Sequence, residues 1–209
     1  MANNHGVSPY SRIVVPVSAA GHPLAAGFTG EINLPANTFV SWGLPGDSAI
    51  VAIVAGHEPR KAVVYAYEKG ALLPDGRRAP HRRVFSPMPV VGALQLGQLA
   101  SAAISWASDV QTGFKRALLL TNQAALLPEE TMVEQLLVSL GFEVMTMPAI
   151  DSRDQDVMDG AILVIPASVR AEKLEHKFTN LSHAIVLLNK RESARDLGLI
   201  RRPIPPRSG

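Results

Sequence analysis

The pattern of hydrophobic and polar positions predicts a series of short strands in the first half of the chain. Apolar, β-branched runs bounded by glycine or proline occur at residues 12–17, 30–40, 49–55, 60–68 and 82–86. The run at 49–55 is apolar throughout, which is typical of a strand buried on both faces. In the next run, Tyr65 and Tyr67 alternate with Val64 and Ala66, so the two pairs should lie on opposite faces of a sheet.

Helical periodicity predicts two longer helices. Apolar residues recur at three- and four-residue spacing over residues 94–108. A second helix should begin at Pro128, because proline followed by Glu129 and Glu130 is favourable in a first turn. It should end before Gly141, which suits the left-handed residue that commonly follows a helix.

The second half alternates between strands and helical or polar segments. Strands are predicted at residues 116–121, 142–147, 160–166 and 183–189, and a short helix at 171–178. Strands that alternate with helices form parallel sheets, whereas the closely spaced strands of the first half should pair as hairpins. The predicted fold class is α/β: a three-layer, Rossmann-like (flavodoxin-like) sheet, mixed but mostly parallel, with helices on both faces.

Composition places the chain among globular proteins. It has 209 residues, 47% of them hydrophobic and 18% charged, which argues against general disorder. No apolar run reaches the ~18 residues that a membrane span needs, and residues 1–10 lack the basic start and apolar stretch of a secretory signal. We therefore expect no membrane association and a cytoplasmic location, either free or in a particle assembled in the cytoplasm.

Charge and cysteine content narrow the possible partners. The formal net charge is +2 and no Lys/Arg stripe is interleaved with aromatic residues, which argues against a nucleic-acid partner. The chain has no cysteine, so it can form neither disulfides nor thiolate metal sites. No two histidines stand at metal-ligand spacing and no glycine-rich phosphate loop occurs, so we predict no metal site and no cofactor.

Two sets of short blocks carry a family resemblance. The first set comprises residues 134–144, 160–169, 177–178, 184–188 and 196–199. The second set comprises residues 22–28, 42–43, 62–70, 82–85 and 102–107. The first set resembles the opening half of class I glutamine amidotransferase-like modules, and the second set resembles their closing half. The His-Pro-x-x-x-Gly stretch at 22–27 is also similar to the trehalose-utilisation (ThuA-like) branch of that fold.

The two halves stand in reversed order relative to the family, and the resemblance therefore implies a circular permutation. The termini of compact domains often lie close together, so such a rearrangement is physically reasonable. A fragment that spans two tandem copies is the alternative. The predicted segments are a flexible N-terminus at 1–11, a single domain at 12–199 (closing half 12–107, linker 108–115, opening half 116–199) and a Pro/Arg-rich tail at 200–209.

The resemblance leaves the chemistry open. The cysteine nucleophile of the family sits at a strand-to-helix elbow that corresponds here to Asn189 or Lys190, and neither supplies a thiol. We therefore predict no catalytic residue and leave enzymatic activity open, with a non-enzymatic role favoured.

Ser168 has two interpretations. It either caps a helix over residues 169–173 or acts as a nucleophile, and no Gly-x-Ser-x-Gly motif surrounds it. The second interpretation would use His176 or His183 together with Asp196.

Ligands of open α/β sheets bind at the carboxyl ends of the parallel strands. On this basis and on the resemblance, the predicted ligand-binding residues are His22, Trp42, Asn122, Ser168 and Asn189. Two of them also have structural interpretations: His22 as a loop histidine whose ring bonds a backbone carbonyl, and Trp42 as core packing rather than a surface that stacks on a sugar.

The tail contains Arg201, Arg202 and Arg207 among prolines, and is either a solvated extension or an arm that binds a partner. Three functions remain open on this basis. The first is a non-catalytic scaffold that works as a protein-interaction or assembly subunit, as a homo-oligomer or within a larger assembly. The others are a sugar-binding or sugar-processing protein of the trehalose-utilisation type, and a serine hydrolase.

Overall fold

The computed structural model describes residues 5–36, 38–108, 115–174, 176–188, 194–195 and 197–200, and for residues 5–8 it describes the backbone alone. The chain begins with six strands: β1 (His5–Pro9), β2 (Arg12–Val14), β3 (Glu31–Asn33), β4 (Phe39–Gly43), β5 (Ile50–Ala55) and β6 (Glu58–Tyr67). These strands pair with one another antiparallel. The single strand predicted at 30–40 is instead the two strands β3 and β4, so Trp42 lies within a strand.

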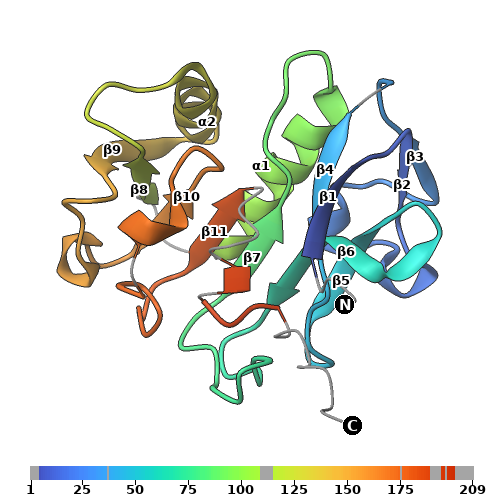
Figure 1. Cartoon of the computed structure of the whole chain (residues 1–209), viewed down its shortest axis with the longest axis horizontal. Coiled ribbons are helices and arrows are strands. Elements are labelled where there is room, and N and C mark those ends of the chain that lie inside the picture. The colour runs from blue at the N-terminus through green and yellow to red at the C-terminus, as the bar shows by residue number, and fades with distance from the viewer. Residues whose placement is uncertain are drawn as a thin grey trace, which may run out of the picture.

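The rest of the chain contributes β7 (Arg83–Ser86), α1 (Leu94–Ser108), β8 (Lys115–Thr121), α2 (Pro128–Ser139), β9 (Phe142–Pro148), β10 (Ala161–Ile165) and β11 (Ile185–Leu188). Within the described residues, eleven strands form one sheet in the order β3-β2-β5-β6-β7-β11-β10-β8-β9, with β4 beside β6 and β1 beside β4 (Figure 1). β7 joins the two parts, because it is antiparallel to β6 and parallel to β11. From β7 to β9 the strands are all parallel, and the predicted α/β class with a mixed sheet is confirmed.

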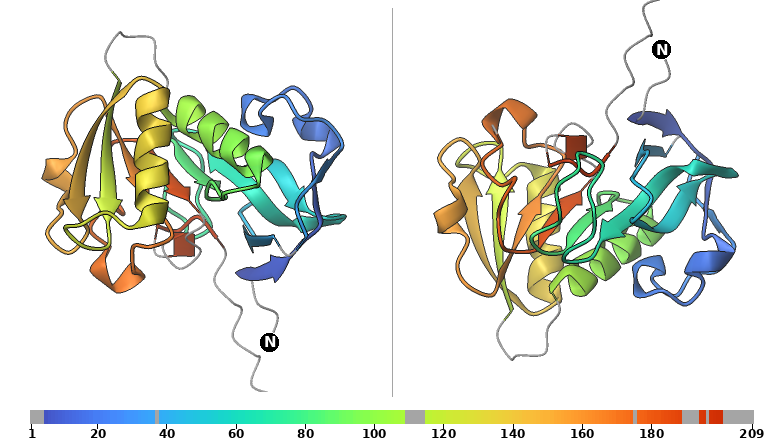
Figure 2. Two further views of the ribbon diagram at one scale, coloured as in Figure 1. Left: turned by 90° about the horizontal axis from the view of Figure 1, so that it is seen from above. Right: turned by 90° about the horizontal axis from the view of Figure 1, so that it is seen from below.

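Both α-helices pack on the same face of the sheet (Figure 2). The apolar stripe of α1 buries Leu96, Leu99 and Ala103, and α2 buries Val133 and Leu137. The predicted bounds of α1 are confirmed, and α2 begins at the proline that predicts it. Within the described residues, no helix combines the length and apolarity that crossing a membrane requires.

Loops and short turns cover the opposite face. The covering segments are residues 70–81, the 3-10 turns η3 (Asp154–Asp156) and η4 (Ala171–Lys173), and residues 197–200. Neither α-helix contributes to this face, so helices on both faces are not confirmed. The reason lies in the connections. Residues 150–160 contain four aspartates and lack the apolar stripe that a packed helix needs. The helix predicted at 171–178 is only the short turn η4, which ends before His176, whose φ of 62° is incompatible with a right-handed helix.

Residues from both halves of the chain build both hydrophobic clusters. On the helix-covered face, Ile13 and Val64 belong to the same cluster as Leu119. On the loop-covered face, the ring of Tyr65 stacks on Phe85 at 5.0 Å in a cluster that also contains Leu163. The alternation predicted for the two tyrosines of β6 is confirmed, because Tyr65 and Tyr67 face the second cluster and Val64 and Ala66 the first.

Residues 197–200 return to the strands of the first half. The Tyr67 hydroxyl donates a hydrogen bond of 2.9 Å to the carbonyl of Leu199. Ile200 is buried beside Gly43, where an added Cβ would come within 2.6 Å of its Cγ2 atom. Gly43 pairs in turn with His5 of β1. The first and last described residues of the chain therefore meet at the end of β4.

Candidate functional site

The carboxyl ends of β8 and β10 form the point where the chain leaves the sheet in opposite directions. After β8 the chain passes to α2 on the helix-covered face. After β10 it passes to η4 and Phe178 on the loop-covered face. Crevices at such switch points hold the ligands of open α/β sheets, so this end of the sheet is the first place to look for a site.

Glu130 occupies this position and is completely buried. Its Oε1 atom accepts one hydrogen bond from the backbone N–H of Asn122 and one from the hydroxyl of Ser168, both at 2.7 Å. Its Oε2 atom accepts from the backbone N–H of Leu127 at 2.9 Å. Glu130 is at the third position of α2, from which a glutamate can reach back to the residue that precedes the helix. The carboxylate therefore ties the end of β8, the start of α2 and the end of β10 together.

Lys173 adds a cation to the same strand end, because its ammonium group donates to the carbonyl of Asn122. The side-chain Oδ1 atom of Asn122 is buried without a hydrogen-bond partner. The neighbouring Thr121 hydroxyl donates to the carbonyl of Gln123 at 2.7 Å. The lysine and the hydroxyl thus hold the backbone of the turn after β8 from both sides.

The structure brings two of the predicted ligand-binding residues together. Asn122 and Ser168 both bond Glu130, which the sequence interpretation treated only as a favourable acid in a first turn. The capping interpretation of Ser168 is wrong, because η4 begins at Ala171 with Arg170 as its preceding residue and the serine hydroxyl bonds Glu130 instead. The acid three residues after Leu127 was the only sequence signal for this cluster.

Ser168 donates to a carboxylate rather than to an imidazole. His183 precedes β11, at the opposite end of the parallel strands, and its Nε2 atom lies 3.8 Å from Asp159. His176 is exposed, and Asp196 lies outside the described residues. Within the described part of the chain, no Ser–His–acid arrangement is therefore assembled around Ser168.

The other predicted site residues lie elsewhere. His22 precedes a turn over Pro23–Ala25, and its Nδ1 atom accepts a hydrogen bond of 3.2 Å from the amide of Leu24, so the ring does not bond a carbonyl there as expected. Trp42 is 7% exposed in the core, with the Lys61 ammonium 4.8 Å above its ring, and offers no face to a sugar. Asn189, Arg201, Arg202 and Arg207 lie outside the described residues.

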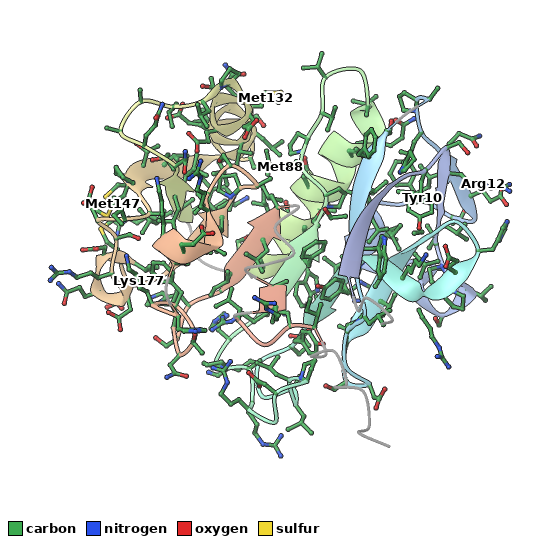
Figure 3. All side chains as sticks on the ribbon, in the orientation of Figure 1. Tyr10, Arg12, Met88, Met132, Met147 and Lys177 are labelled. Atoms are coloured by element: carbon green, nitrogen blue, oxygen red, sulfur yellow. The ribbon has the colours of Figure 1, made fainter. Side chains whose placement is uncertain are left out.

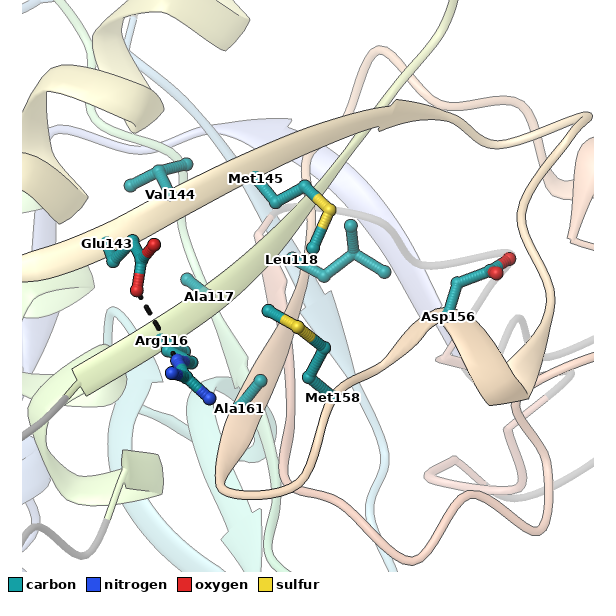
Figure 4. Close-up of a pocket in the computed structure, with 9 residues that line it drawn as sticks. All are labelled: Arg116, Ala117, Leu118, Glu143, Val144, Met145, Asp156, Met158 and Ala161. Carbon is teal, nitrogen blue, oxygen red and sulfur yellow. Dashed lines mark hydrogen bonds and ion pairs between the residues drawn. The ribbon is translucent and has the colours of Figure 1, made fainter.

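A cavity of about 250 Å³ opens beside β9 on the loop-covered face (Figure 4). Met145 of β9 and Met158 of the following connection give it an apolar wall, together with Leu118 of β8. At its rim Arg116 and Glu143 form an ion pair with 3.4 Å between Nε and Oε2. The walls of this pocket are mainly apolar, and Asp156 adds a carboxylate beyond the Arg116–Glu143 pair.

A second cavity, of about 440 Å³, lies at the amino ends of β10 and β11. The Nδ1 atoms of His81 and His183, which both line it, are buried without a hydrogen-bond partner. Burial, followed by the nearby charge of Arg83, lowers the pKa of His81 below its ordinary value. The His81 imidazole at this cavity therefore resists protonation.

Arg83 itself is buried and donates to the carbonyls of His183 and Leu181 at 2.6 and 2.5 Å. Burial, with Arg77 as a smaller cause, lowers the pKa of Arg83 to about 10. Among the described residues, no group of three or more His, Cys, Asp or Glu side chains is arranged to hold a metal ion.

The chain was compared with protein-family models, curated proteins and solved structures, and none of them matches it.

Proposed function

We propose that this chain is a non-catalytic scaffold of the amidotransferase-like type, in circularly permuted order, that binds protein chains as an interaction or assembly subunit. The strand order supports the architecture. Counted from β8, the parallel strands β9-β8-β10-β11-β7 stand in the order 2-1-3-4-5, which is that of flavodoxin-like folds. The fifth place is filled by β7, which precedes the other four in the sequence.

The positions of the chain ends support the permutation. A permuted chain needs its new ends close together and its former ends joined by a short connection. Ile200 packs beside Gly43, and Gly43 pairs with His5, so the described ends are neighbours. The former ends would be α1 and β8, which only residues 109–114 separate. In flavodoxin-like order these are the last helix and the first strand.

The switch point supports a role without catalysis. Glu130 is completely buried at the ends of β8 and β10, and the two oxygens of its carboxylate accept three hydrogen bonds. The hydroxyl of Ser168 is one of these donors, so the serine bonds a carboxylate that two backbone amides also hold, and it has no imidazole partner among the described residues. The thiol that the family uses cannot exist in a chain without cysteine.

The observation that carries the binding role is the pocket beside β9. An extended partner that pairs with a free strand edge gains affinity from backbone hydrogen bonds and specificity from side-chain pockets. β9 is the last strand in the sheet order, and three of its residues, Glu143, Val144 and Met145, line the pocket. A strand edge and a pocket for its partner's side chains therefore stand together.

The absence of cysteine makes the experiment direct, because a single introduced thiol is unique. Thr146→Cys in β9 and Asn33→Cys in β3 both place a thiol on an exposed strand position, at opposite ends of the sheet. Each variant is labelled with a benzophenone maleimide and irradiated in an extract of the source cells. We expect protein adducts from residue 146 well above those from residue 33. Adducts with this chain count as protein adducts. Equal yields from residues 146 and 33, or no adduct from residue 146 to any protein, would overturn the proposal.

A further inference from the structure

The outer edge of β9 is free along its whole length. All seven residues pair with β8 in an unbroken register, from Phe142 opposite Lys115 to Pro148 opposite Thr121, and no other described strand pairs with them. The other end of the main sheet is different. β3 has three residues, and its Glu31 forms an ion pair with Arg12 and lies 3.1 Å from Nε2 of His57. Arg12 and Met147 mark these two ends at opposite sides of the molecule (Figure 3).

The free edge has few of the features that usually keep strand edges apart. Proteins protect such edges with charged side chains, prolines, bulges or very short strands. The one proline of β9, Pro148, is its last residue. β9 has no bulge, and its single charge, Glu143, is paired with Arg116 of β8. Large apolar side chains are exposed on the segments around it: Val138 at 59%, Ile150 at 58% and Met158 at 41%. The edge is therefore close to neutral and is flanked by apolar surface.

The residues of β9 are compatible with an identical strand placed antiparallel to it. A two-fold axis at Met145, the central residue, is the register that pairs all seven residues. Val144 then faces Thr146 of the second copy, and β-branched side chains pair well across strands. Glu143 faces Met147 of the second copy, so no two glutamates oppose each other. Met147 lies on the same sheet face as Met145 and would enter the pocket region of the other copy.

We propose that the occupant of this edge is a second copy of the chain, paired β9 to β9 across a two-fold axis at Met145. The proposal rests on the proposed function and names the partner of that same surface. Such an interface is isologous, so each copy supplies the same strand and the same pocket. The two sheets become one continuous sheet through the interface.

Disulfide trapping tests the register. Residues directly opposed in an antiparallel pair have Cα atoms about 4.5–5.5 Å apart, within the range that a disulfide spans. Met145→Cys should therefore yield a disulfide-linked dimer under mild oxidation, whereas Asn33→Cys on β3 should stay monomeric. An equimolar mixture of Val144→Cys and Thr146→Cys should form disulfides only between the two different variants. This mixture tests the same register without any substitution at Met145, in case Met145→Cys does not fold.

Light scattering and sedimentation on the unmodified chain give the oligomeric state without any substitution. Thr146→Lys, at an exposed position, should raise the dissociation constant about tenfold, because it replaces a favourable cross-strand pair twice in the symmetric interface. Asn33→Lys is the matched control and should leave it unchanged. A chain that stays monomeric at all concentrations, with no link at residue 145, would overturn the second copy as partner. Adducts from residue 146 to other proteins would in that case still support the proposed function.

Discussion

Glu130 and Ser168 are joined by a hydrogen bond of 2.7 Å between a completely buried carboxylate and a serine hydroxyl. The bond connects the first turn of α2 to the end of β10, 38 residues apart in sequence. It links two strand ends at the point where open α/β sheets commonly hold a ligand, and it makes the Ser168 hydroxyl a donor that supports the fold.

Replacement of this carboxylate should destabilise the protein. In Glu130→Gln, the amide nitrogen would face one of the three groups that now donate to the carboxylate, so one buried polar contact becomes unfavourable. We expect the free energy of unfolding to fall by about 1–3 kcal/mol. Urea unfolding followed by circular dichroism measures it. Ser168→Ala removes a single donor and should cost about 0.5–1.5 kcal/mol. Equal stability of Glu130→Gln and the unmodified chain would contradict this role.

A methyl group at Gly43 should displace the end of the described chain. The added Cβ would lie 2.6 Å from Cγ2 of Ile200 and 3.0 Å from the Tyr65 hydroxyl, so Gly43→Ala should cost about 1–3 kcal/mol of stability. Ile200→Ala makes room for this methyl group, and the double variant should lose less stability than the sum of the two single variants.

Gly97→Ala is the matched control for that experiment. Gly97 lies in α1, and nothing is within 4 Å of the place where its Cβ would be. The control should gain roughly 0.5–1 kcal/mol, because alanine is the better helix former. Additive losses at Gly43 and Ile200 would show that residue 200 does not pack there in solution.

His81 should make the fold less stable in acid. Its pKa in the folded protein is below the ordinary value of 6.5, because of burial and the nearby Arg83, Lys69, Arg82 and His183. As the pH falls through 6.5, the unfolded chain takes up a proton at this position before the folded chain does, so stability falls. His81→Gln removes this titrating group, so its contribution to the loss of stability in acid disappears.

The measurement is the midpoint of thermal unfolding between pH 8 and pH 5. The decline towards acid should be shallower in His81→Gln than in the unmodified chain. His176→Asn is the control, since His176 is exposed and asparagine tolerates its positive φ. If both variants follow the same pH profile, His81 does not resist protonation.

Reconnection of the chain tests the permutation. A variant in which residue 209 is joined to residue 1, with new ends opened within residues 109–114, keeps every residue and has the segment order of the amidotransferase-like modules that the proposal invokes. Because the described ends meet at Gly43, we expect the same circular dichroism spectrum and a cooperative unfolding transition. A control opened between Val63 and Val64, inside β6, should fail to fold. Failure of both variants would count against a permuted domain.

Most helices and strands could be predicted from the sequence because they depend on the spacing of apolar residues close together in the chain. Apolar spacing over residues 94–108 predicts α1 to its observed ends, and the alternation at Tyr65 and Tyr67 predicts their shared face. Where the local signal was weak, the prediction failed. Residues 171–178 carry no sustained apolar stripe, and among those of them that the structure describes the turn η4 is the only helical element. The site was less accessible, since nothing in the sequence around Glu130 indicates that Ser168 donates to it.

The sequence by itself determined α1, the start of α2, most of the strands, the mixed sheet and the absence of a thiol nucleophile, because each depends on residue type and near-neighbour spacing. It did not predict β1, which lies in the segment expected to be a flexible N-terminus. Only the tertiary structure decided which strand lies beside which. It placed β7 next to β11, put both helices on one face and left the edge of β9 free. These properties arise from contacts between residues far apart in the chain. The local pattern of apolar residues shows which positions are buried, but it does not identify the distant residues against which they pack.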